Sequence, residues 1–328
     1  MTDAVRPTSE LAIETRGLTK KFGRYAAVND VDLRVPHGAV FGFLGPNGSG
    51  KTTTIRMLLG LASPTRGEAR VLGQNMARNV SAVLPRVGAL VEGPGFYPYL
   101  SGEANLRRLD SADRYAPSST RDARVASALA RVGLTAAARK KVRAYSLGMK
   151  QRLGIANALL TPRELLVLDE PTNGLDPQGT REVRALIRSL ASEGTTVFVS
   201  SHLLAEIEQI CTHAAVMSVG SLVAQGTLDE LRQVGRSRVR LVTPDLLLAL
   251  PVLKRFGLTI EPGNPEGVAS GSGDPVVVAS FGDATLEPER IVAALVHAKV
   301  RVRGFDIEGA SLEDRFVALT GEGFNVEH

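Results

Sequence analysis

The first part of the chain alternates apolar and polar residues in short segments that glycines separate. Residues 12–23 (AIETRGLTKKFG) and 26–38 (AAVNDVDLRVPHG) follow this pattern, which is typical of β-strands with one buried face. Residues 39–44 and 165–168 are continuous apolar runs instead, and such runs predict strands that are covered on both faces. We therefore expect a β-rich start followed by a buried central sheet.

Helical periodicity marks the segments between and after these strands. Residues 101–158 are mostly helical in pattern. Residues 143–160 (RAYSLGMKQRLGIANALL) predict a helix with one apolar face, and its first turn is unusual because a serine and a glycine leave it with few bulky side chains. Residues 181–194 predict a helix that ends at a glycine, before another apolar strand at residues 195–202. This strand–helix–strand alternation predicts an α/β fold whose parallel strands are joined by crossover helices.

The composition of the chain changes near residues 233–238, and a second set of elements follows. Their order is βαββαβ plus a last helix, which predicts a small ferredoxin-like α+β domain. We expect domains at residues 1–235 and 236–328. The expected elements of the second are strands at residues 239–242, 258–261, 276–281 and 301–307, and helices at residues 245–256, 287–299 and 311–319.

Length and composition agree with two folded domains. The chain has 328 residues and a net charge of +5, which a solvated basic surface explains without nucleic acid or anionic lipid. Cys211 is the only cysteine, so an internal disulfide is excluded and a buried thiol is expected. The polar N-terminus lacks a signal-peptide core, and no apolar run reaches the ~18–20 residues that span a bilayer. We expect a chain that does not cross a membrane by itself.

A phosphate-binding loop is the strongest chemical signal in the sequence. GPNGSGKT at residues 45–52 matches G-x-x-x-x-G-K-[ST] between an apolar strand and a helix. The glycines let backbone N–H groups converge on phosphate oxygens, and the helix N-terminus adds positive charge. Lys51 would reach the β- and γ-phosphates, and the Thr52 hydroxyl would be offered to magnesium. The residues predicted to bind the nucleotide here are Gly45, Pro46, Asn47, Gly48, Ser49, Gly50, Lys51, Thr52 and Thr53.

Two carboxylates follow the apolar run LLVL. In nucleotidases with this loop, an acid at the end of such a strand holds magnesium directly or through water, which predicts that role for Asp169. Glu170 lies one residue further, where a carboxylate can take a proton from an attacking water. Asp169 alone indicates a bound nucleotide, and its neighbour Glu170 indicates hydrolysis.

Residues 11–231 resemble the nucleotide-binding subunit of ATP-binding-cassette (ABC) transporters, with the motifs in family order and spacing. GPNGSGKT resembles the Walker A loop, and LLVLDE resembles the Walker B strand with its catalytic glutamate. NGLDP, residues 173–177, is similar to the D-loop and gives Asp176 a place in the nucleotide site. His202 after VSS matches the switch histidine, which is expected to sense the γ-phosphate and support the glutamate. The resemblance implies a P-loop NTPase of ABC type: a mixed sheet core with a β-subdomain and a helical subdomain at about residues 93–160.

The bare helix tip in residues 143–160 resembles the family's signature motif. In this family two subunits pair head-to-tail, and each signature tip closes over the ATP that the other subunit's Walker A loop holds. Ser146 and Gly148 are then expected to contact the nucleotide of a second subunit, since a helix N-terminus is a sound anion site. An aromatic residue stacks on adenine in the family, and Phe22 in KFG is the candidate. The alternatives are Tyr25 as the stacking residue and a core role for Phe22.

Two positions depart from the family pattern. The common signature LSGGQ reads YSLGM at residues 145–149, so Leu147 and Met149 replace a glycine and a glutamine. The Q-loop position, usually a glutamine, is Glu92, whose carboxylate would bind the metal or orient water. Both variants are similar to the subfamily that exports drugs, antibiotics and peptides, as in daunorubicin and bacitracin resistance. The ending GASLEDRFVALTG is similar to the accessory tail of that group, which implies dimer support or regulation.

The resemblance implies an ATPase subunit that binds ATP and Mg²⁺, pairs with a second copy of itself and drives a transmembrane permease on separate chains. Its place would be the cytoplasmic face of the cell membrane, where the permease would hold it. Its cargo would be drugs, antibiotics, peptides or lipid-like compounds. Two alternatives stay open: the ATPase of an ABC importer, and an ABC-type ATPase that acts on ribosomes or DNA. The roughly one hundred residues between Lys51 and Ser146 are too few for a coiled-coil arm, so no nucleic acid partner is expected.

Overall fold

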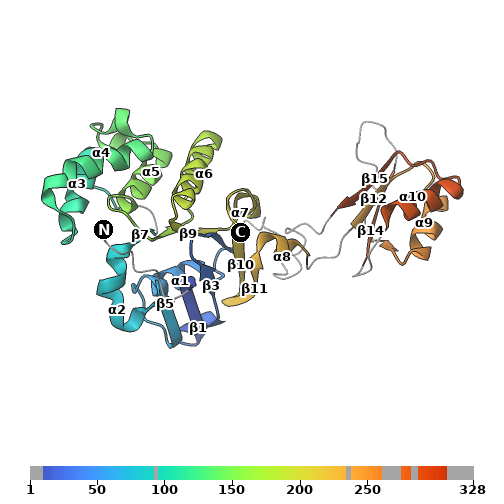
Figure 1. Cartoon of the computed structure of the whole chain (residues 1–328), viewed down its shortest axis with the longest axis horizontal. Coiled ribbons are helices and arrows are strands. Elements are labelled where there is room, and N and C mark those ends of the chain that lie inside the picture. Colours follow the sequence, from blue (N-terminus) through green and yellow to red (C-terminus); the bar gives the residue numbers. More distant parts are fainter. Residues whose placement is uncertain (1–9, 92–94, 234–237, 261–274, 282–286, 309–328) are drawn as a thin grey trace, which may run out of the picture. The chain divides into compact units, whose positions relative to one another are not determined.

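The computed structural model describes residues 10–91, 95–233, 238–260, 275–281 and 287–308. The chain forms two compact units, and the division between them falls between Leu228 and Asp229. Figure 1 follows the chain through the elements of each unit. The domain bounds expected from the sequence, residues 1–235 and 236–328, stay a prediction.

The central sheet of the first unit is mixed. Its strand order is β11-β10-β4-β9-β8-β7, with parallel neighbours from β10 to β7 and an antiparallel edge strand, β11. Every residue of β4, β8 and β9 is buried, and both faces of such strands must be apolar, which explains their continuous apolar sequence. The strands are β4 (Val40–Leu44), β7 (Val87–Leu90), β8 (Leu165–Asp169), β9 (Thr196–Ser201), β10 (His213–Ser218) and β11 (Ser221–Thr227).

An antiparallel sheet forms the β-subdomain, in the order β2-β1-β5-β6 with β3 beside β1. It shares one hydrophobic core with the central sheet, in which Ile13, Phe41 and Ile55 are fully or almost fully buried. The alternating segment 26–38 contributes to two strands, which residues 32 and 33 separate, and Asp30 within the first of them has a left-handed φ of 57°. The strands are β1 (Leu11–Phe22), β2 (Tyr25–Val31), β3 (Arg34–Pro36), β5 (Arg66–Val71) and β6 (Gln74–Asn75).

Helices connect the strands of the central sheet. The longest of them in the described chain, α6, buries Val183, Ile187 and Leu190, a spacing that places one apolar face on the sheet. The helices are α1 (Lys51–Leu58), α2 (Met76–Val83), α6 (Pro177–Ser192) and α7 (Leu204–Ile210). A further helix, α8 (Leu228–Gln233), follows the last strand of this sheet, β11, and the division between the two units falls after its first residue. Cys211 follows α7 and is buried, as the sequence predicts.

The helical subdomain contains α3 (Gly102–Ala112), α4 (Arg121–Arg131) and α5 (Leu147–Ala158), drawn in green in Figure 1. Its helices contact one another, and α5 also contacts strand β7 of the central sheet. Asp110 of α3 is fully buried and accepts hydrogen bonds from Arg121 and Arg124. This charged cluster fixes α3 against the start of α4. The bundle also places the N-terminus of α5, the predicted signature tip.

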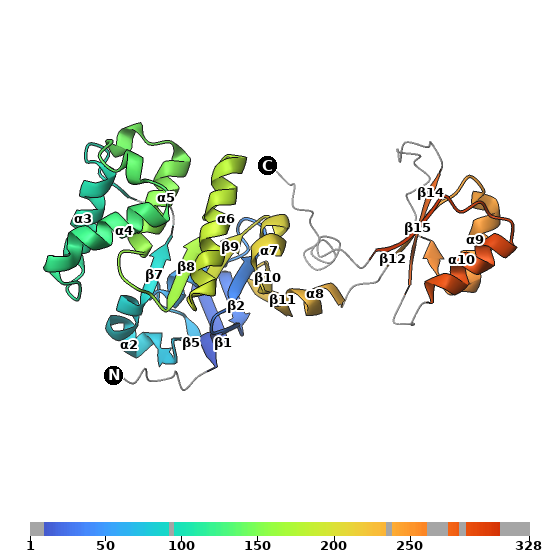
Figure 2. The ribbon, with the colours of Figure 1, turned by 45° about the horizontal axis from the view of Figure 1, so that its top comes forward.

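The second unit has the expected βαββαβ order. Its sheet is antiparallel in the order β13-β14-β12-β15, and Figure 2 shows α9 and α10 together on one face of it. The ferredoxin-like assignment stays a prediction, and the helix expected at residues 311–319 lies outside the described residues. The elements are β12 (Arg238–Val242), α9 (Leu246–Arg255), β13 (Thr259–Ile260), β14 (Val276–Ser280), α10 (Pro288–His297) and β15 (Gly304–Glu308).

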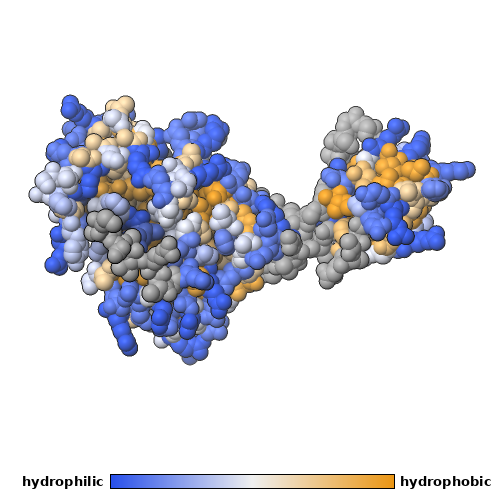
Figure 3. All heavy atoms as spheres, viewed as in Figure 1, coloured by the Kyte–Doolittle hydropathy of each residue, from blue (hydrophilic) through white to orange (hydrophobic). Residues whose placement is uncertain are grey.

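The surface of the second unit carries exposed apolar side chains. Leu247 and Leu248 of α9 and Val296 of α10 are exposed, and Figure 3 shows apolar residues gathered on this unit. In that view the first unit shows polar side chains with smaller apolar areas between them. Within the described ranges, no helix combines the length and the apolar character that crossing a bilayer requires.

Candidate functional site

The loop of residues 45–50 joins β4 to the N-terminus of α1. No side chain caps the first turn of α1, so its N–H groups are left for an anion. Gly50 precedes the helix with a φ of 102°, and a Cβ there would lie 2.4 Å from the carbonyl oxygen of Ala27. Ser49 Oγ is buried without a hydrogen-bond partner in the described part of the chain. The loop thus has the shape and the unmet polar groups of a phosphate cradle.

Lys51 begins α1 and is buried. Its Nζ donates hydrogen bonds to the carbonyl oxygens of Gly45 (2.6 Å) and Pro46 (3.1 Å), and lies 3.7 Å from Oε1 of Glu170. Burial lowers the pKa of Lys51, while the negative charges of Glu170 and Asp169 partly oppose this shift. A cation held by two carbonyls and one carboxylate is well placed to bind an anion that enters the loop.

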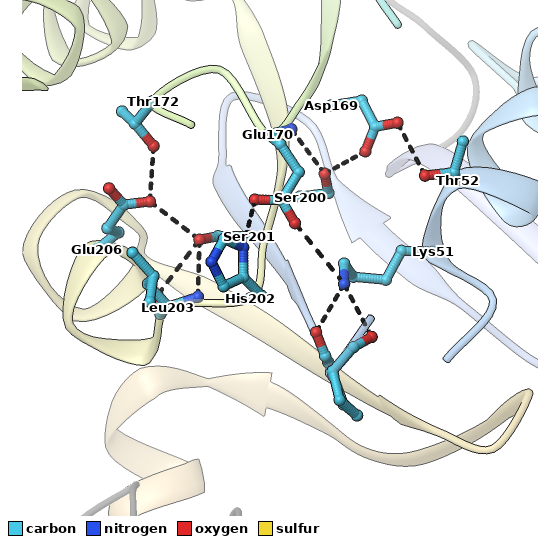
Figure 4. A network of polar contacts seen from close by, with 12 residues as sticks. Lys51, Thr52, Asp169, Glu170, Thr172, Ser200, Ser201, His202, Leu203 and Glu206 are labelled. Atoms are coloured by element: carbon cyan, nitrogen blue, oxygen red, sulfur yellow. Dashed lines mark hydrogen bonds and ion pairs between the residues drawn. The ribbon is translucent and has the colours of Figure 1, made fainter. Parts of the chain in front are cut away.

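Thr52, in the first turn of α1, reaches the end of β8. Its Oγ1 donates to Oδ2 of Asp169 at 3.0 Å, and Oδ1 of the same carboxylate accepts from Ser200 of β9 (Figure 4). Hydroxyl and carboxylate oxygens are the ligands that Mg²⁺ prefers, so this pair fits the ion. No group of three His, Cys, Asp or Glu in the described ranges could hold a metal, so an ion here also needs phosphate or water. Glu92, the other expected ligand, lies outside the described residues.

Glu170 has a left-handed backbone, with a φ of 48°. Its N–H donates to Ser200 Oγ at 2.9 Å, and its Oε2 lies 2.8 Å from Nδ1 of His202, which follows β9. Oε1 is buried without a hydrogen-bond partner among the described residues, although Lys51 is within ion-pair distance. One carboxylate oxygen is therefore oriented by the histidine, and the other keeps acceptor capacity for a water molecule.

A second polar network involves the residues on either side of His202. Glu206 of α7 is buried, and its Oε2 accepts from Thr172 Oγ1 (2.7 Å) and from Ser201 Oγ (2.9 Å). Ser201 Oγ in turn accepts from the N–H of Leu203 at 3.0 Å (Figure 4). Glu206 thus joins the segment after β8 to the segment after β9, which carry the two candidate catalytic side chains.

Two further predicted residues cap helices. Ser146 is the N-cap of α5 and accepts from the N–H of Met149 at 3.2 Å, while Asp176 is the N-cap of α6 and accepts from Gly179 at 2.9 Å. Ser146 is exposed, and the half-buried Gly148 adds no side chain beside it. The signature tip is therefore a capped helix N-terminus that still faces solvent.

Phe22 and Tyr25 lie at the tip of the β1–β2 hairpin, where they pair with each other across the strands. Phe22 is 55% exposed and Tyr25 is 61% exposed, so a core role for Phe22 is wrong. Lys20 Nζ lies 5.2 Å from the centroid of the Phe22 ring. Both rings are therefore exposed at the hairpin tip, where one of them could stack on a planar ligand.

The structure brings Lys51, Thr52, Asp169, Glu170 and His202 into one connected network (Figure 4). Phe22, Ser146, Gly148 and Asp176 make no hydrogen bond or ion pair to these five side chains within the described ranges. Sequence reasoning missed Ser200 and Glu206. Their signal was weak: a serine near the end of an apolar strand, and an acid in a helix where acids are common.

Comparisons with known proteins identify the family. The family model described as ABC transporter matches residues 28–173. A bacitracin transport ATP-binding protein, BcrA of Bacillus licheniformis, is 39% identical over 95% of this chain and 98% of its own. The daunorubicin/doxorubicin resistance ATP-binding protein DrrA of Streptomyces peucetius is 35% identical over 94% of this chain and 92% of its own.

Solved structures agree with the fold. The ATP-binding subunit of an ABC transporter superposes with a TM-score of 0.61 at 28% identity, covering 67% of this chain and 92% of that chain. The match covers nearly the full length of both relatives. The phosphate loop, the paired carboxylates and the histidine lie together in the structure, as expected for this family. The chain therefore belongs to the ABC transporter family, as one of its ATP-binding, ATP-hydrolysing subunits.

Proposed function

We propose that this subunit binds Mg–ATP in a head-to-tail dimer and drives a separate transmembrane permease. The cargo that we propose is a drug, antibiotic, peptide or lipid-like compound, exported from the cell. The observation that carries the proposal is the Glu170 carboxylate, oriented by His202 through one oxygen while the other oxygen is buried without a hydrogen bond. Such a carboxylate is prepared to accept a proton from water.

The phosphate loop supplies the binding energy for the nucleotide. Backbone N–H groups of residues 47–53 converge on the β- and γ-phosphates, and Lys51 exchanges its contacts with the Gly45 and Pro46 carbonyls for phosphate oxygens. Ser49 Oγ gains a partner in the same step. At the hairpin tip, Phe22 stacks on the adenine ring.

Thr52 and Asp169 would hold a magnesium ion between the loop and β8, and Glu92 would complete this set. When bound, the ion neutralises charge on the transferred phosphoryl group. Thr52 and Asp169 already face each other at 3.0 Å, so the chain has little to rearrange. Ser200 keeps the Asp169 carboxylate turned toward Thr52, because it occupies the other oxygen.

Hydrolysis then depends on Glu170 and His202. Glu170 accepts a proton from the water that attacks the γ-phosphate. His202 keeps the carboxylate in place and senses the γ-phosphate. Ser146 and Gly148 of a second subunit complete the nucleotide site. The N-terminus of a helix favours an anion, and Gly148 has no side chain that would obstruct its approach. Asp176 lies at the same proposed interface.

The permease is proposed from the relatives, whose names describe bacitracin transport and daunorubicin resistance. A cassette of this family needs a membrane-spanning partner to move a solute. We place the subunit at the cytoplasmic face of the membrane, bound through that partner.

Glu170→Gln tests the proposal. The amide keeps the size of the side chain but cannot take the proton, so ATP hydrolysis should fall by about 10²- to 10⁴-fold. ATP-dependent dimers should persist and be visible by size-exclusion chromatography. Glu289→Gln, at an exposed position of α10, is the matched control and should keep wild-type turnover. Unchanged hydrolysis by Glu170→Gln would reject the assigned base.

The partner is tested by purifying the tagged chain from detergent-solubilised cells. A polytopic membrane protein in stoichiometric amount supports the proposal. Ribosomes or DNA in its place would overturn the assignment to transport.

A further inference from the structure

Glu206 is a buried acid to which the proposed chemistry gives no role. It lies in the first turn of α7 and is 8% exposed. A buried carboxylate lowers the stability of a protein unless polar partners compensate for the lost water. Its role is therefore found in the groups that its two oxygens hold.

The two oxygens of Glu206 have different partners. Oε2 accepts hydrogen bonds from Thr172 Oγ1 at 2.7 Å and from Ser201 Oγ at 2.9 Å, and both hydroxyl residues are buried. Oε1 lies 3.7 Å from Nη2 of Arg184, in α6, which is beyond hydrogen-bond reach. The shorter contacts of the carboxylate are thus the two hydroxyls, and a single oxygen atom connects two loops.

The loop on one side starts at Glu170. Thr172 follows it by two positions, and the ring of Pro171 between them fixes one backbone dihedral angle. Glu170 has the left-handed φ of 48°, a conformation that persists only where surrounding contacts enforce it. The hydrogen bond from Thr172 to Glu206 is such a contact, because few free dihedral angles separate it from the Glu170 backbone.

The loop on the other side carries His202. Ser201 precedes it, and Ser201 Oγ accepts from the N–H of Leu203 at 3.0 Å while it donates to Glu206. The hydroxyl of Ser201 therefore joins the residues on either side of His202 and holds the chain in a tight turn. Figure 4 shows this turn beside Glu206, with the imidazole directed toward Glu170.

These contacts close into a ring around the candidate catalytic pair. On one side, Thr172 joins Oε2 of Glu206 to the segment of Glu170. On the other side, Ser201 joins the same oxygen to the segment of His202. The 2.8 Å contact between Glu170 and His202 completes the ring. Loss of the acceptor at Glu206 would release both segments at once.

We propose that Glu206 is a positioning residue, which sets the geometry of the Glu170–His202 pair for ATP hydrolysis by accepting one hydrogen bond from each loop. The inference rests on the proposed function, because it needs Glu170 as the base. Within the described ranges, Glu206 has no hydrogen bond or ion pair to the phosphate loop. Its loss should therefore lower kcat and leave the affinity for ATP unchanged.

Four variants test this role. Glu206→Met keeps the length of the side chain but has no oxygen to accept a hydrogen bond. Glu206→Gln keeps a carbonyl oxygen that can accept from both hydroxyls, so it is the conservative variant. Thr172→Val removes one donor with little change of shape. Glu208→Met changes an exposed acid of the same helix and is the matched control.

Steady-state hydrolysis gives kcat per folded chain, and a fluorescent ATP analogue gives Kd. A small displacement of a catalytic group is costly, so kcat of Glu206→Met should fall about 10- to 100-fold. Thr172→Val should be several-fold slower than wild type, and Glu206→Gln should recover most of the rate that Glu206→Met loses. Glu208→Met should match wild type, and Kd should be unchanged in all four.

A role in folding alone gives a different result. Weaker nucleotide binding or less folded protein, with an unchanged kcat per folded chain, would overturn the inference. Glu206→Gln as slow as Glu206→Met would overturn it too, because the acceptor oxygen would then be irrelevant. If Glu206→Met does not fold, Thr172→Val decides by the same kcat and Kd measurements.

The Glu170→Gln background shows whether Glu206 acts through the pair. Single-turnover hydrolysis of radiolabelled ATP measures the residual rate of this chain with and without Glu206→Met. A residue that acts only by placing the base should not lower that rate further, since the base is already absent. A further loss equal to the one seen with Glu170 present would reveal an independent effect and overturn the inference.

The same chains keep the two proposals apart. If Glu170→Gln hydrolyses ATP at the wild-type rate, the proposed base is wrong and the inference fails with it. If Glu170→Gln is slow but Glu206→Met keeps the wild-type kcat, only the inference fails. Both stand if Glu206→Met is slow, Glu206→Gln is not, and the double variant is no slower than Glu170→Gln.

Discussion

Nδ1 of His202 lies 2.8 Å from Oε2 of Glu170, although 32 positions separate the two residues in sequence. The contact exists because β8 and β9 are parallel neighbours and both side chains follow their C-terminal ends. Asp169 pairs with Ser200 in that ladder, so the next residues of each segment meet above the sheet edge. The candidate catalytic pair is thus a direct product of strand register.

His202→Ala should lower kcat by about 100-fold, because Glu170 loses the group that orients its carboxylate. KM for ATP should change little, since the phosphate loop is untouched. Steady-state kinetics check both values. His297→Ala, in α10 of the second unit, is the control and should behave as wild type. An equal loss in both variants would contradict the role of His202.

Ser200→Ala should weaken the metal site without removing a ligand. Ser200 Oγ donates to Asp169 and accepts from the N–H of Glu170, so its loss frees two candidate site residues at once. Removal of a group that orients a ligand typically costs about 10- to 100-fold in metal affinity or activity. Hydrolysis measured against Mg²⁺ concentration should shift by that amount. Ser192→Ala, at the exposed end of α6, is the matched control.

Phe22→Ala should raise the Kd for ATP about 10-fold, because stacking of an aromatic ring on a base contributes roughly 1–3 kcal/mol. Tyr25→Ala is the paired variant at the same hairpin, with a similarly exposed ring. Binding of a fluorescent nucleotide distinguishes the two. A loss confined to Tyr25→Ala would transfer the adenine contact to that residue.

Asp110→Ala should destabilise the helical subdomain by about 3 kcal/mol, because it leaves Arg121 and Arg124 without their buried partner. Urea denaturation followed by circular dichroism gives the free energy of unfolding. Asp122→Ala is the control, since Asp122 also pairs with an arginine, Arg107, but is largely exposed. If Asp110→Ala lowers the free energy of unfolding no more than Asp122→Ala does, the ion pairs of Asp110 gain nothing from being buried, and this prediction is wrong.

The same cluster predicts a dependence on pH. The hydrogen bond from Arg124 lowers the pKa of Asp110, and Arg121 adds to this shift, although burial opposes it. A carboxyl whose pKa is lowered by folding stabilises the native state above its unfolded pKa of about 3.9, and loses this contribution as pH falls through the native value. Wild-type stability should therefore drop in that acidic range more than the stability of Asp110→Ala does.

Cys211 should resist thiol reagents in the native protein. It is 9% exposed, and burial raises the pKa of its thiol, so little reactive thiolate forms at neutral pH. Labelling with a chromogenic disulfide should be undetectable in buffer and complete in denaturing urea. Rapid native labelling would contradict the burial of this thiol.

Local motifs of this protein could be predicted from the sequence, because their chemistry depends on contiguous residues. The loop 45–52 and the pair Asp169–Glu170 need only a strand before them and a helix after the loop. The βαββαβ order of the second unit also follows from periodicity. Proximity of His202 to Glu170 was expected from family resemblance, and not from spacing.

The remaining contacts could not be predicted because they depend on tertiary register. Gln151 reaches the Glu170 carbonyl only because α5 packs beside the end of β8, and Glu206 reaches Thr172 only through the placement of α7. A buried glutamine or glutamate has no sequence pattern that distinguishes it from a surface one.

The left-handed backbone of Glu170 has an evolutionary consequence. A residue with a side chain in that conformation typically raises the energy of the native state by about 1–3 kcal/mol, and glycine adopts it freely. A library selected only for thermal tolerance should therefore enrich glycine at position 170 and yield robust, inert proteins. Under the proposed function, this chain accepts the cost in stability because turnover needs the Glu170 carboxylate.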